Sequence, residues 1–113
     1  MDCLFCKIIN GQIPSDIVFE DESIMAFRDI APQAPVHVLV IPKTHLSGMN
    51  DITDDNKEIA GLIFSKIPEI AKITGISESG YRVVSNCGSD ACQSVNHLHF
   101  HILGGKKLSE KMA

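Results

Sequence analysis

Apolar residues follow two different spacings along this chain, and the spacings predict its secondary structure. Alternating or β-branched apolar runs are typical of strands, whereas apolar residues three or four positions apart are typical of helices. We therefore expect strands at residues 17–20, 23–28, 36–41, 81–85 and 98–103, with a hairpin turn at Asp21 and Glu22. Residues 3–10 have an apolar face and are followed by Gly11, which predicts a short helix.

The longest helical pattern lies in the middle of the chain. Its apolar positions are Ile59, Leu62, Ile63, Ile67, Ile70 and Ile73, and the pattern ends at Gly75. Thr53 or Asp54 is the expected N-cap. Pro68 interrupts the pattern, so one kinked helix or two shorter helices could satisfy it. The order of these elements predicts an α+β fold with about five antiparallel strands, one long helix and one short helix.

Length and charge narrow the class of protein. We interpret the 113 residues as a single domain, 1–113, with a short polar tail at 106–113. The formal net charge is −4 and the basic residues are scattered, so we expect no binding to nucleic acid or to anionic membranes. No apolar run could span a bilayer, and residues 1–4 lack the features of a secretory signal. These features favour a cytoplasmic protein.

The strongest chemical signal is the run His97-Leu98-His99-Phe100-His101-Ile102-Leu103. Successive side chains of a strand point to opposite faces, so the three histidines should share one face while the apolar residues face the core. Three charged imidazoles would repel one another, so we expect neutral or metal-bound rings. The run alone fits either three ligands of a metal or one nucleophile whose neighbours bind an anion and move protons.

The segment before this run favours the nucleophile. Residues 88–95 (GSDACQSV) contain glycine and serine and lead directly into the histidines. Such a loop can direct backbone N–H groups and hydroxyls at a phosphate. A histidine that attacks phosphorus requires this kind of anion-binding arrangement beside it.

Several segments together resemble the signature of the histidine triad (HIT) superfamily, in particular its Hint branch, the histidine triad nucleotide-binding proteins. They are residues 93–96 (QSVN) with the histidine run, residues 27–37 (FRDIAPQAPVH), residues 41–45 (IPKTH) and residues 103–105 (LGG). The resemblance covers residues 3–105 and implies a HIT-like sheet that continues across a homodimer. The helix at 54–74 and the strand at 81–85 would form the dimer surface, although this helix could equally be plain core.

The resemblance implies a hydrolase that cleaves the P–N bond of purine nucleoside 5′-phosphoramidates, including AMP-lysine-like and aminoacyl-adenylate-type compounds. The expected partners are purine nucleotides such as AMP or GMP, and the chemistry needs no cofactor. Two alternatives stay open. One is another HIT activity, such as dinucleoside polyphosphate hydrolysis or nucleotidyl transfer. The other is a nucleotide- or partner-binding module without catalysis.

The resemblance also implies roles for individual residues. His99 corresponds to the nucleophile that forms a nucleotidyl-histidine intermediate, and His101 to a phosphate contact. Ser94 would bind near the leaving group, and His37 would lie behind the nucleophile. Asp29 is similar to the carboxylate that holds the ribose hydroxyls. The remaining expected nucleotide contacts are the purine-pocket residues Phe5, Ile8, Phe27 and Ile30 and the loop residues Asn86, Cys92, Gln93 and Val95.

Each of these assignments has a plainer structural alternative. An Asp at the end of a strand, like Asp29, is often only a turn residue. On pattern alone, the four purine-pocket residues would be core. His37 lies in an apolar strand, where a histidine usually has a structural role.

A second site is suggested by Cys3 and Cys6, which have the CxxC spacing. Two disulfides would suit a secreted protein, but the missing signal favours free thiols or metal ligands. His45 and His97 have no role in the phosphoryl chemistry, so the four residues form a Cys₂His₂ set suited to structural zinc. Some HIT proteins of bacteria with this CxxC resemble that arrangement. A redox CxxC and unliganded thiols are the alternatives.

Two positions depart from the Hint pattern. Cys92 stands where glycine is usual, beside the expected phosphate site, and Cys87 is also uncommon there. A local disulfide between them is disfavoured in a reducing compartment. Oxidative control through Cys92 is a speculative alternative.

Overall fold

The computed structural model describes residues 3–112, so Met1, Asp2 and Ala113, the ends of the predicted domain, lie outside the described residues. The elements in chain order are α1 (Leu4–Ile9), β1 (Ile17–Glu20), β2 (Ile24–Arg28), β3 (Val36–Pro42), α2 (Glu58–Ile73), β4 (Tyr81–Val84) and β5 (Phe100–Gly104). Two 3₁₀ turns, Met49–Asp51 and Ser89–Ala91, lie in the loops around α2 and β4. Every predicted strand and helix is therefore present.

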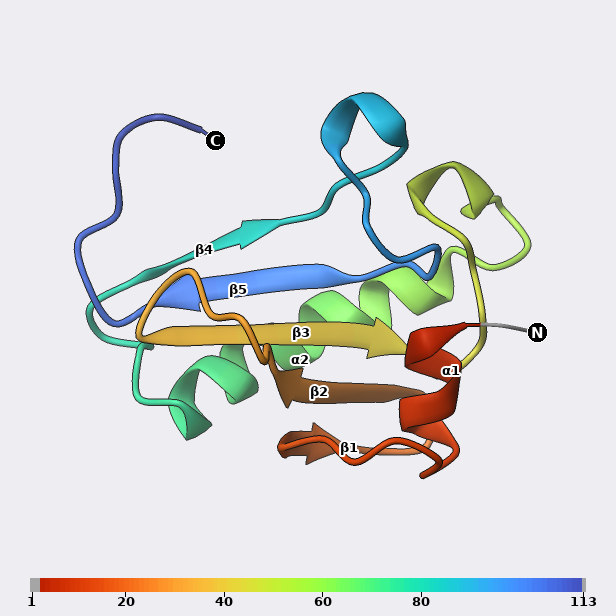
Figure 1. Cartoon of the computed structure of the whole chain (residues 1–113), viewed down its shortest axis with the longest axis horizontal. Helices are drawn as coiled ribbons and strands as arrows, with labels where there is room; N and C mark the ends of the chain where they lie inside the picture. The colour runs from red at the N-terminus through yellow and green to blue at the C-terminus, as the bar shows by residue number, and fades with distance from the viewer. Residues whose placement is uncertain (1–2, 113) are drawn as a thin grey trace.

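The strands form one five-stranded sheet in the order β1-β2-β3-β5-β4, and all neighbours are antiparallel. This confirms the predicted α+β fold. The last strand, β5, lies between β3 and β4, where Phe100 pairs with Val40 and His101 with both Leu39 and Val84. β1 and β4 are the edge strands, and Figure 1 shows β4 at the edge far from α1.

The two faces of the sheet pack against different helices, with α1 in front and α2 behind in Figure 1. The face toward α2 carries the larger apolar cluster, in which Val38 and Phe100 pack against Ile63 and Ile70. The face toward α1 carries a smaller one of Cys3, Phe5, Ile8, Met25, Phe27, Leu39 and Ile41. Burial of such side chains stabilises a fold by roughly 1.5–3 kcal/mol each. Because β3 is covered on both faces, alternation along it assigns every second side chain to each cluster.

The start of α2 differs from the prediction. Neither Thr53 nor Asp54 caps the helix, which begins at Glu58 after a series of turns. The Thr53 hydroxyl instead accepts the Asp55 N–H at 3.2 Å, and the Thr53 N–H donates to the Asn56 side chain at 2.7 Å. Thr53 thus satisfies a separate turn that leads into the helix.

Pro68 does not divide the helix. α2 is continuous from Glu58 to Ile73, which selects the single-helix alternative. Pro68 lies on the exposed side, where water can replace the donor that proline lacks. Among residues 3–112, no helix is both long and apolar enough to cross a membrane.

The histidine run begins before the sheet does. β5 starts at Phe100 rather than at the predicted residue 98, because the Leu98 N–H donates to the Leu46 carbonyl at 2.6 Å instead of joining the ladder. The predicted alternation nevertheless holds. Leu98, Phe100 and Ile102 are buried in the cluster against α2, whereas His99 and His101 line a pocket on the other side.

Candidate active site

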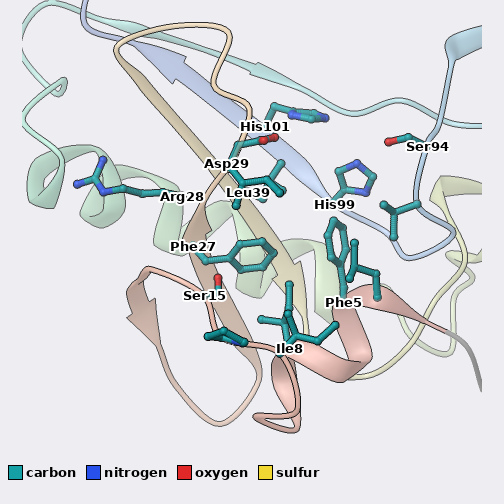
Figure 2. A pocket seen from close by; sticks show the side chains of 15 residues that line it. Phe5, Ile8, Ser15, Phe27, Arg28, Asp29, Leu39, Ser94, His99 and His101 are labelled. Carbon is teal, nitrogen blue, oxygen red and sulfur yellow. The ribbon is translucent and has the colours of Figure 1, made fainter.

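A pocket of about 310 Å³ opens on the α1 side of the sheet, between α1, the end of β2 and the loop before β5. Figure 2 shows its two ends, with Ser94 and His99 at one and Ile8 and Ser15 at the other. Its lining consists of Leu4, Phe5, Ile8, Ile13, Pro14, Ser15, Phe27, Arg28, Asp29, Ile30, Leu39, Ser94, Val95, His99 and His101. The pocket therefore joins an apolar slot to a polar end that carries two histidines.

The apolar slot is the open side of the smaller core cluster. Phe5 and Phe27 pack edge to face with ring centroids 5.5 Å apart, and both are almost fully buried. Ile30 is fully exposed and lies at the rim rather than in the wall. A slot lined by aromatic and aliphatic side chains suits a flat, weakly polar ring.

The His99 ring has one fixed tautomer. Its Nδ1 lies 2.7 Å from the backbone carbonyl oxygen of His97, which can only accept a hydrogen bond. Nδ1 must therefore carry the proton, and in the neutral ring the lone pair belongs to Nε2. The ring is almost fully buried, and the edge of Phe5 packs against it with centroids 5.2 Å apart. His99 thus offers an oriented nucleophilic nitrogen.

The His101 ring has the opposite tautomer, set by a chain of hydrogen bonds. The Gln33 N–H donates to Nδ1 of His37 at 3.0 Å, so Nε2 of the neutral His37 ring carries the proton. That Nε2–H donates to Nδ1 of His101 at 2.8 Å. The neutral His101 ring therefore carries its proton on Nε2 and can donate it to a bound anion. In the structure, the His37 ring contacts His101, whereas the family resemblance implied a place behind His99.

Burial keeps this chain of rings neutral. It lowers the pKa of His101 to about 4, with further lowering from the neighbouring His99 and His37. Burial also lowers the pKa of His37, which the nearby Asp29 carboxylate partly opposes. Desolvation disfavours the charged imidazolium in both cases. At neutral pH both rings therefore keep the lone pairs that the hydrogen-bond chain requires.

Asp29 follows the last residue of β2, and its two carboxylate oxygens have different neighbours. Its Oδ1 accepts the Ala31 N–H at 2.8 Å, which is turn chemistry, and its Oδ2 lies 3.5 Å from Nε2 of His37. Asp29 also lines the pocket, where Figure 2 shows it beside His101. A carboxylate in that place can accept hydrogen bonds from a pair of hydroxyls.

The loop before β5 contributes fewer pocket residues than expected. Ser94 and Val95 line the pocket, but Asn86, Cys92 and Gln93 do not. The Asn86 side chain donates to the Ala91 carbonyl at 2.9 Å and braces the loop from within. Cys92 is exposed and has φ of 60°, a left-handed conformation at a position where the pattern expects glycine.

The Gln93 side chain turns away from the pocket and ties the loop together. Its Oε1 accepts the Gly88 N–H at 2.9 Å, and its Nε2 donates to the carbonyls of Ser47 and Val95 at 2.7 and 3.0 Å. The buried Gly48 permits this contact, because a Cβ there would come within 3.2 Å of the Gln93 side chain. Gln93 thus fixes the loop that carries Ser94 against the segment after His45.

The predicted metal ligands lie together at the N-terminal end of α1. The donor atoms of Cys3, Cys6, His45 and His97 all lie within 4.8 Å of one another. Nδ1 of His97 is 3.2 Å from Cys3 Sγ and 3.1 Å from Nδ1 of His45. Cys6 Sγ is 3.4 Å from Nδ1 of His45. α1 supplies this geometry, since Cys3 is its N-cap and its Sγ accepts the Cys6 N–H.

The donor set fits a zinc ion. Nε2 of His97 lies 2.8 Å from the Pro42 carbonyl oxygen, which can only accept a proton, so the lone pair of the neutral ring is on Nδ1 and faces the cluster. Two sulfurs and two imidazole nitrogens are a tetrahedral zinc set. Burial and the adjacent Cys3 raise the pKa of Cys6 to about 11, so a cation would be needed to hold this thiol as a thiolate.

A second group of potential ligands, Asp29, His37 and His101, has a different character. The hydrogen bond between His37 and His101 uses the lone pair of one ring and the proton of the other. These residues therefore form a proton-bearing chain rather than a set of converging lone pairs.

Several residues that line the pocket were not predicted from the sequence. Leu39 could have been found, since alternation along β3 places it on the same face as His37. Ile13, Pro14 and Ser15 follow α1 in an irregular segment that no periodicity assigns to a site. Arg28 lines the rim, but Figure 2 shows its guanidinium pointing away from the pocket.

Comparisons with known proteins identify the family to which this chain belongs. The family model of the HIT domain matches residues 10–108. Over 112 residues the chain is 41% identical to the purine nucleoside phosphoramidase of Escherichia coli (strain K12), covering 99% of this chain and 94% of that protein. It is 47% identical over 108 residues to a 14 kDa zinc-binding protein of Zea mays, covering 94% of this chain and 84% of that protein.

The fold has an equally close match. A HIT family hydrolase from Clostridium thermocellum superimposes with a TM-score of 0.96 at 46% sequence identity, covering 99% of this chain and 97% of that chain. The chain belongs to the HIT family.

Proposed function

We propose that this protein hydrolyses the P–N bond of purine nucleoside 5′-phosphoramidates through a nucleotidyl intermediate on His99. The observation that carries the proposal is the pair of opposite tautomers in one pocket. His99 presents the lone pair of Nε2, and His101 presents an N–H on Nε2. A nucleophile beside a hydrogen-bond donor is the arrangement that attack on a phosphoryl group requires.

The shape of the pocket supports a nucleotide with its phosphate at the histidines. The purine would lie in the slot between Phe5, Phe27 and Ile8. The ribose hydroxyls would then reach Asp29, which lines the pocket beside His101 (Figure 2). The name of the relative from Escherichia coli supports both the purine and the phosphoramidate.

In the first step, Nε2 of His99 attacks the α-phosphorus and the P–N bond breaks. The positive charge that develops on the ring is stabilised by the Nδ1–H donated to the His97 carbonyl. The Nε2–H of His101 donates to a phosphoryl oxygen as charge builds there. The leaving nitrogen takes a proton from the Ser94 hydroxyl, which is exposed and regains one from water.

In the second step, water attacks the phosphorus of the nucleotidyl-histidine and Nε2 of His99 leaves with the bonding electron pair. The proton of the attacking water passes to the solvent through Ser94. The sum is one water consumed, one amine and one nucleoside monophosphate released, and a neutral His99 restored. No redox change occurs at any step.

We further propose that Cys3, Cys6, His45 and His97 hold a structural zinc ion. The converging donor atoms support this, and so does the name of the zinc-binding relative from Zea mays. When bound, zinc would stabilise the two thiolates and link α1 to the start of β5. The site has no ligand position left open for substrate.

We also propose a homodimer through β4 and α2. Tyr81 and Val83 on β4 and Phe64 and Ile73 on α2 leave large apolar surfaces exposed. Val83 pairs with Ile102, whose side chain packs against α2, so the exposed side chains of β4 share the α2 face. An unpaired edge strand beside an apolar face is a typical surface for self-association.

The test of the proposed reaction is steady-state hydrolysis of a fluorogenic adenosine 5′-phosphoramidate. Wild-type protein should turn the substrate over, and His99→Ala should lose turnover while binding AMP with near wild-type affinity in calorimetry. Asn96→Ala, an exposed loop change outside the pocket lining, should behave like the wild type. Near-normal turnover by folded His99→Ala would reject the nucleophile. A folded wild type that binds AMP without any turnover would reject the reaction.

A further inference from the structure

We propose that the Ser15 hydroxyl recognises the polar edge of the nucleobase, and that it admits both 6-amino and 6-oxo purines. The inference rests on the proposed function, which places a purine in the apolar slot of the pocket. It names the side chain that decides which bases bind there. The structural basis is the position of Ser15, at the end of the pocket opposite the histidines.

This end of the pocket offers few other hydrogen-bond partners to a base. Ile13 has an aliphatic side chain, and Pro14 has no backbone N–H to donate. Arg28 lines the rim, but Figure 2 shows its guanidinium pointing away from the pocket, and its Nε lies 3.5 Å from Oδ2 of Asp16. Ser15 thus supplies the polar side chain that faces the apolar slot.

The pairing of β1 with β2 explains why the Ser15 side chain faces the pocket. Ile17 pairs with Phe27, whose ring lines the pocket. The Arg28 N–H donates to the Asp16 carbonyl at 2.9 Å, so the ladder continues one residue before β1. Side chains two residues apart on a strand share a face. Ser15 therefore shares the face of Phe27, whereas Asp16 and Arg28 meet on the opposite face.

The segment that carries Ser15 is fixed at both ends. At the α1 end, the Gln12 N–H donates to the Lys7 carbonyl at 2.9 Å. At the β2 end, the bond from Arg28 to Asp16 holds the next residue along the chain. Ser15 itself is half-buried between these anchors. A group that is already in place before the ligand arrives loses little entropy when the ligand binds.

A hydroxyl suits both kinds of purine because it can donate and accept a hydrogen bond. It can accept from an exocyclic amino group or a ring N–H, and it can donate to a ring nitrogen or a carbonyl oxygen. A carboxylate could only accept and an ammonium group could only donate, so each would favour one base. Ser15 therefore predicts similar affinities for AMP and GMP.

The experiment compares Ser15→Thr with Ser15→Val, two substitutions of nearly equal shape that differ by the hydroxyl. Calorimetry gives the affinity of the wild type and of both variants for AMP and for GMP, without any turnover. Ribose 5-phosphate, titrated in NMR spectra, is the control ligand, since it carries the sugar and the phosphate but no base. Thermal unfolding of the two variants reports whether the hydroxyl contributes to the fold.

We expect Ser15→Thr to bind AMP and GMP within about twofold of the wild type. Ser15→Val should bind both nucleotides about threefold to tenfold more weakly than Ser15→Thr, the effect of one neutral hydrogen bond. The two variants should bind ribose 5-phosphate equally and unfold at the same temperature. With a phosphoramidate substrate, the KM of Ser15→Val should rise by the same factor while kcat stays constant, because the base is bound equally in the ground state and the transition state.

Equal affinities of Ser15→Thr and Ser15→Val for both nucleotides would overturn the proposal. A difference confined to one of the two purines would overturn the dual role of the hydroxyl. A difference that also appears with ribose 5-phosphate would assign the hydroxyl to the sugar instead of the base. A wild type that binds AMP and GMP without turnover would reject the proposed reaction alone, since the binding comparison stands without it. A wild type that binds neither nucleotide would reject both.

Discussion

Nε2 of His37 donates its proton to Nδ1 of His101 across 2.8 Å, so the first histidine decides which nitrogen of the second faces the pocket. Substitution of His37 by Ala should free the His101 ring to adopt either tautomer. We expect kcat to fall by about tenfold to hundredfold, since general-acid and hydrogen-bond donors typically contribute at least that much. His37→Gln keeps an N–H donor at similar reach and should recover part of the loss. Equal kcat values for the Ala and Gln variants would show that the donated proton is irrelevant.

The low pKa of His101 predicts a particular loss of stability in acid. Its pKa is about 4 in the folded protein, below the ordinary value of 6.5. Between these values the unfolded chain binds more protons, so the free energy of unfolding decreases as the pH falls from 6.5 to 4. The contribution of His101 is on the order of 2–3 kcal/mol.

The measurement is urea unfolding at several pH values for the wild type and for His101→Asn. The variant should lose less stability between pH 6.5 and 4, because it lacks the group that gains a proton on unfolding. Acid also affects the histidines of the metal cluster, but that effect is common to both proteins and cancels in the difference. Parallel curves for the two proteins would contradict the prediction.

The hydrogen bonds of the Gln93 side chain predict that its substitution lowers the stability of the fold. The family pattern had suggested a nucleotide contact for this residue. Gln93→Glu removes both N–H donors and places a carboxylate against the carbonyls of Ser47 and Val95. We expect a loss of roughly 1–3 kcal/mol in the free energy of unfolding. A lower kcat/KM should accompany it, because Ser94 is the next residue. Gln12→Glu makes the same charge change at an exposed site and should have little effect. An unchanged melting temperature for Gln93→Glu would show that the three-way contact does not hold the loop.

The left-handed backbone conformation of Cys92 predicts that glycine at this position stabilises the fold. A non-glycine residue in the left-handed region costs about 1 kcal/mol or more, so Cys92→Gly should remove this cost. Part of the gain is offset by the greater freedom of glycine in the unfolded chain. We expect the free energy of unfolding, measured by thermal unfolding, to increase by about 0.5 kcal/mol. Cys92→Ser is the control, because it keeps a non-glycine residue in the left-handed region. A less stable Cys92→Gly protein would mean that the thiol itself contributes to the fold.

The exposed apolar face of β4 predicts the oligomeric state. Light scattering after size exclusion should give twice the mass of one chain for the wild type. Val83→Asp should shift the protein to the monomer, because it places a charge at the centre of that face. Ile17→Asp, an equally exposed apolar position on the opposite edge strand, should stay dimeric. A monomeric wild type would refute the proposed interface.

Periodicity predicted the sheet well because both faces of its inner strands are buried. The run at 36–41 and the alternation at 98–103 encode which side chains face α2 and which face α1, and the structure follows that code. The predicted starts of α2 and β5 were wrong, because hydrogen bonds that no periodic pattern encodes set where these elements begin. The Thr53 turn and the bond from Leu98 to Leu46 are both of this kind.

Some residues of the candidate site could likewise be predicted from the sequence, and others could not. The CxxC spacing and the two histidines without a role in phosphoryl chemistry predicted that Cys3, Cys6, His45 and His97 lie together, because ligand chemistry restricts which residues can share an ion. Asn86 and Gln93 lie in the loop of the family motif, and from the sequence they cannot be distinguished from ligand-binding residues. Their amides can bond equally well to a nucleotide or to a nearby carbonyl. Only the path of the loop decides, and it directs both side chains to backbone carbonyls.

The position of β5 in the sheet has a consequence for how the protein is made. β5 follows the other four strands along the chain, yet within residues 3–112 it lies between β3 and β4 and is the strand that pairs with β4. A nascent chain can pair β1, β2 and β3 and form α2, but β4 must wait for residues near Gly104 to leave the ribosome. Long-range pairings of this kind close late in folding. His99 lies directly before that strand and His101 lies in it, so completion of the core and assembly of the candidate site are a single event.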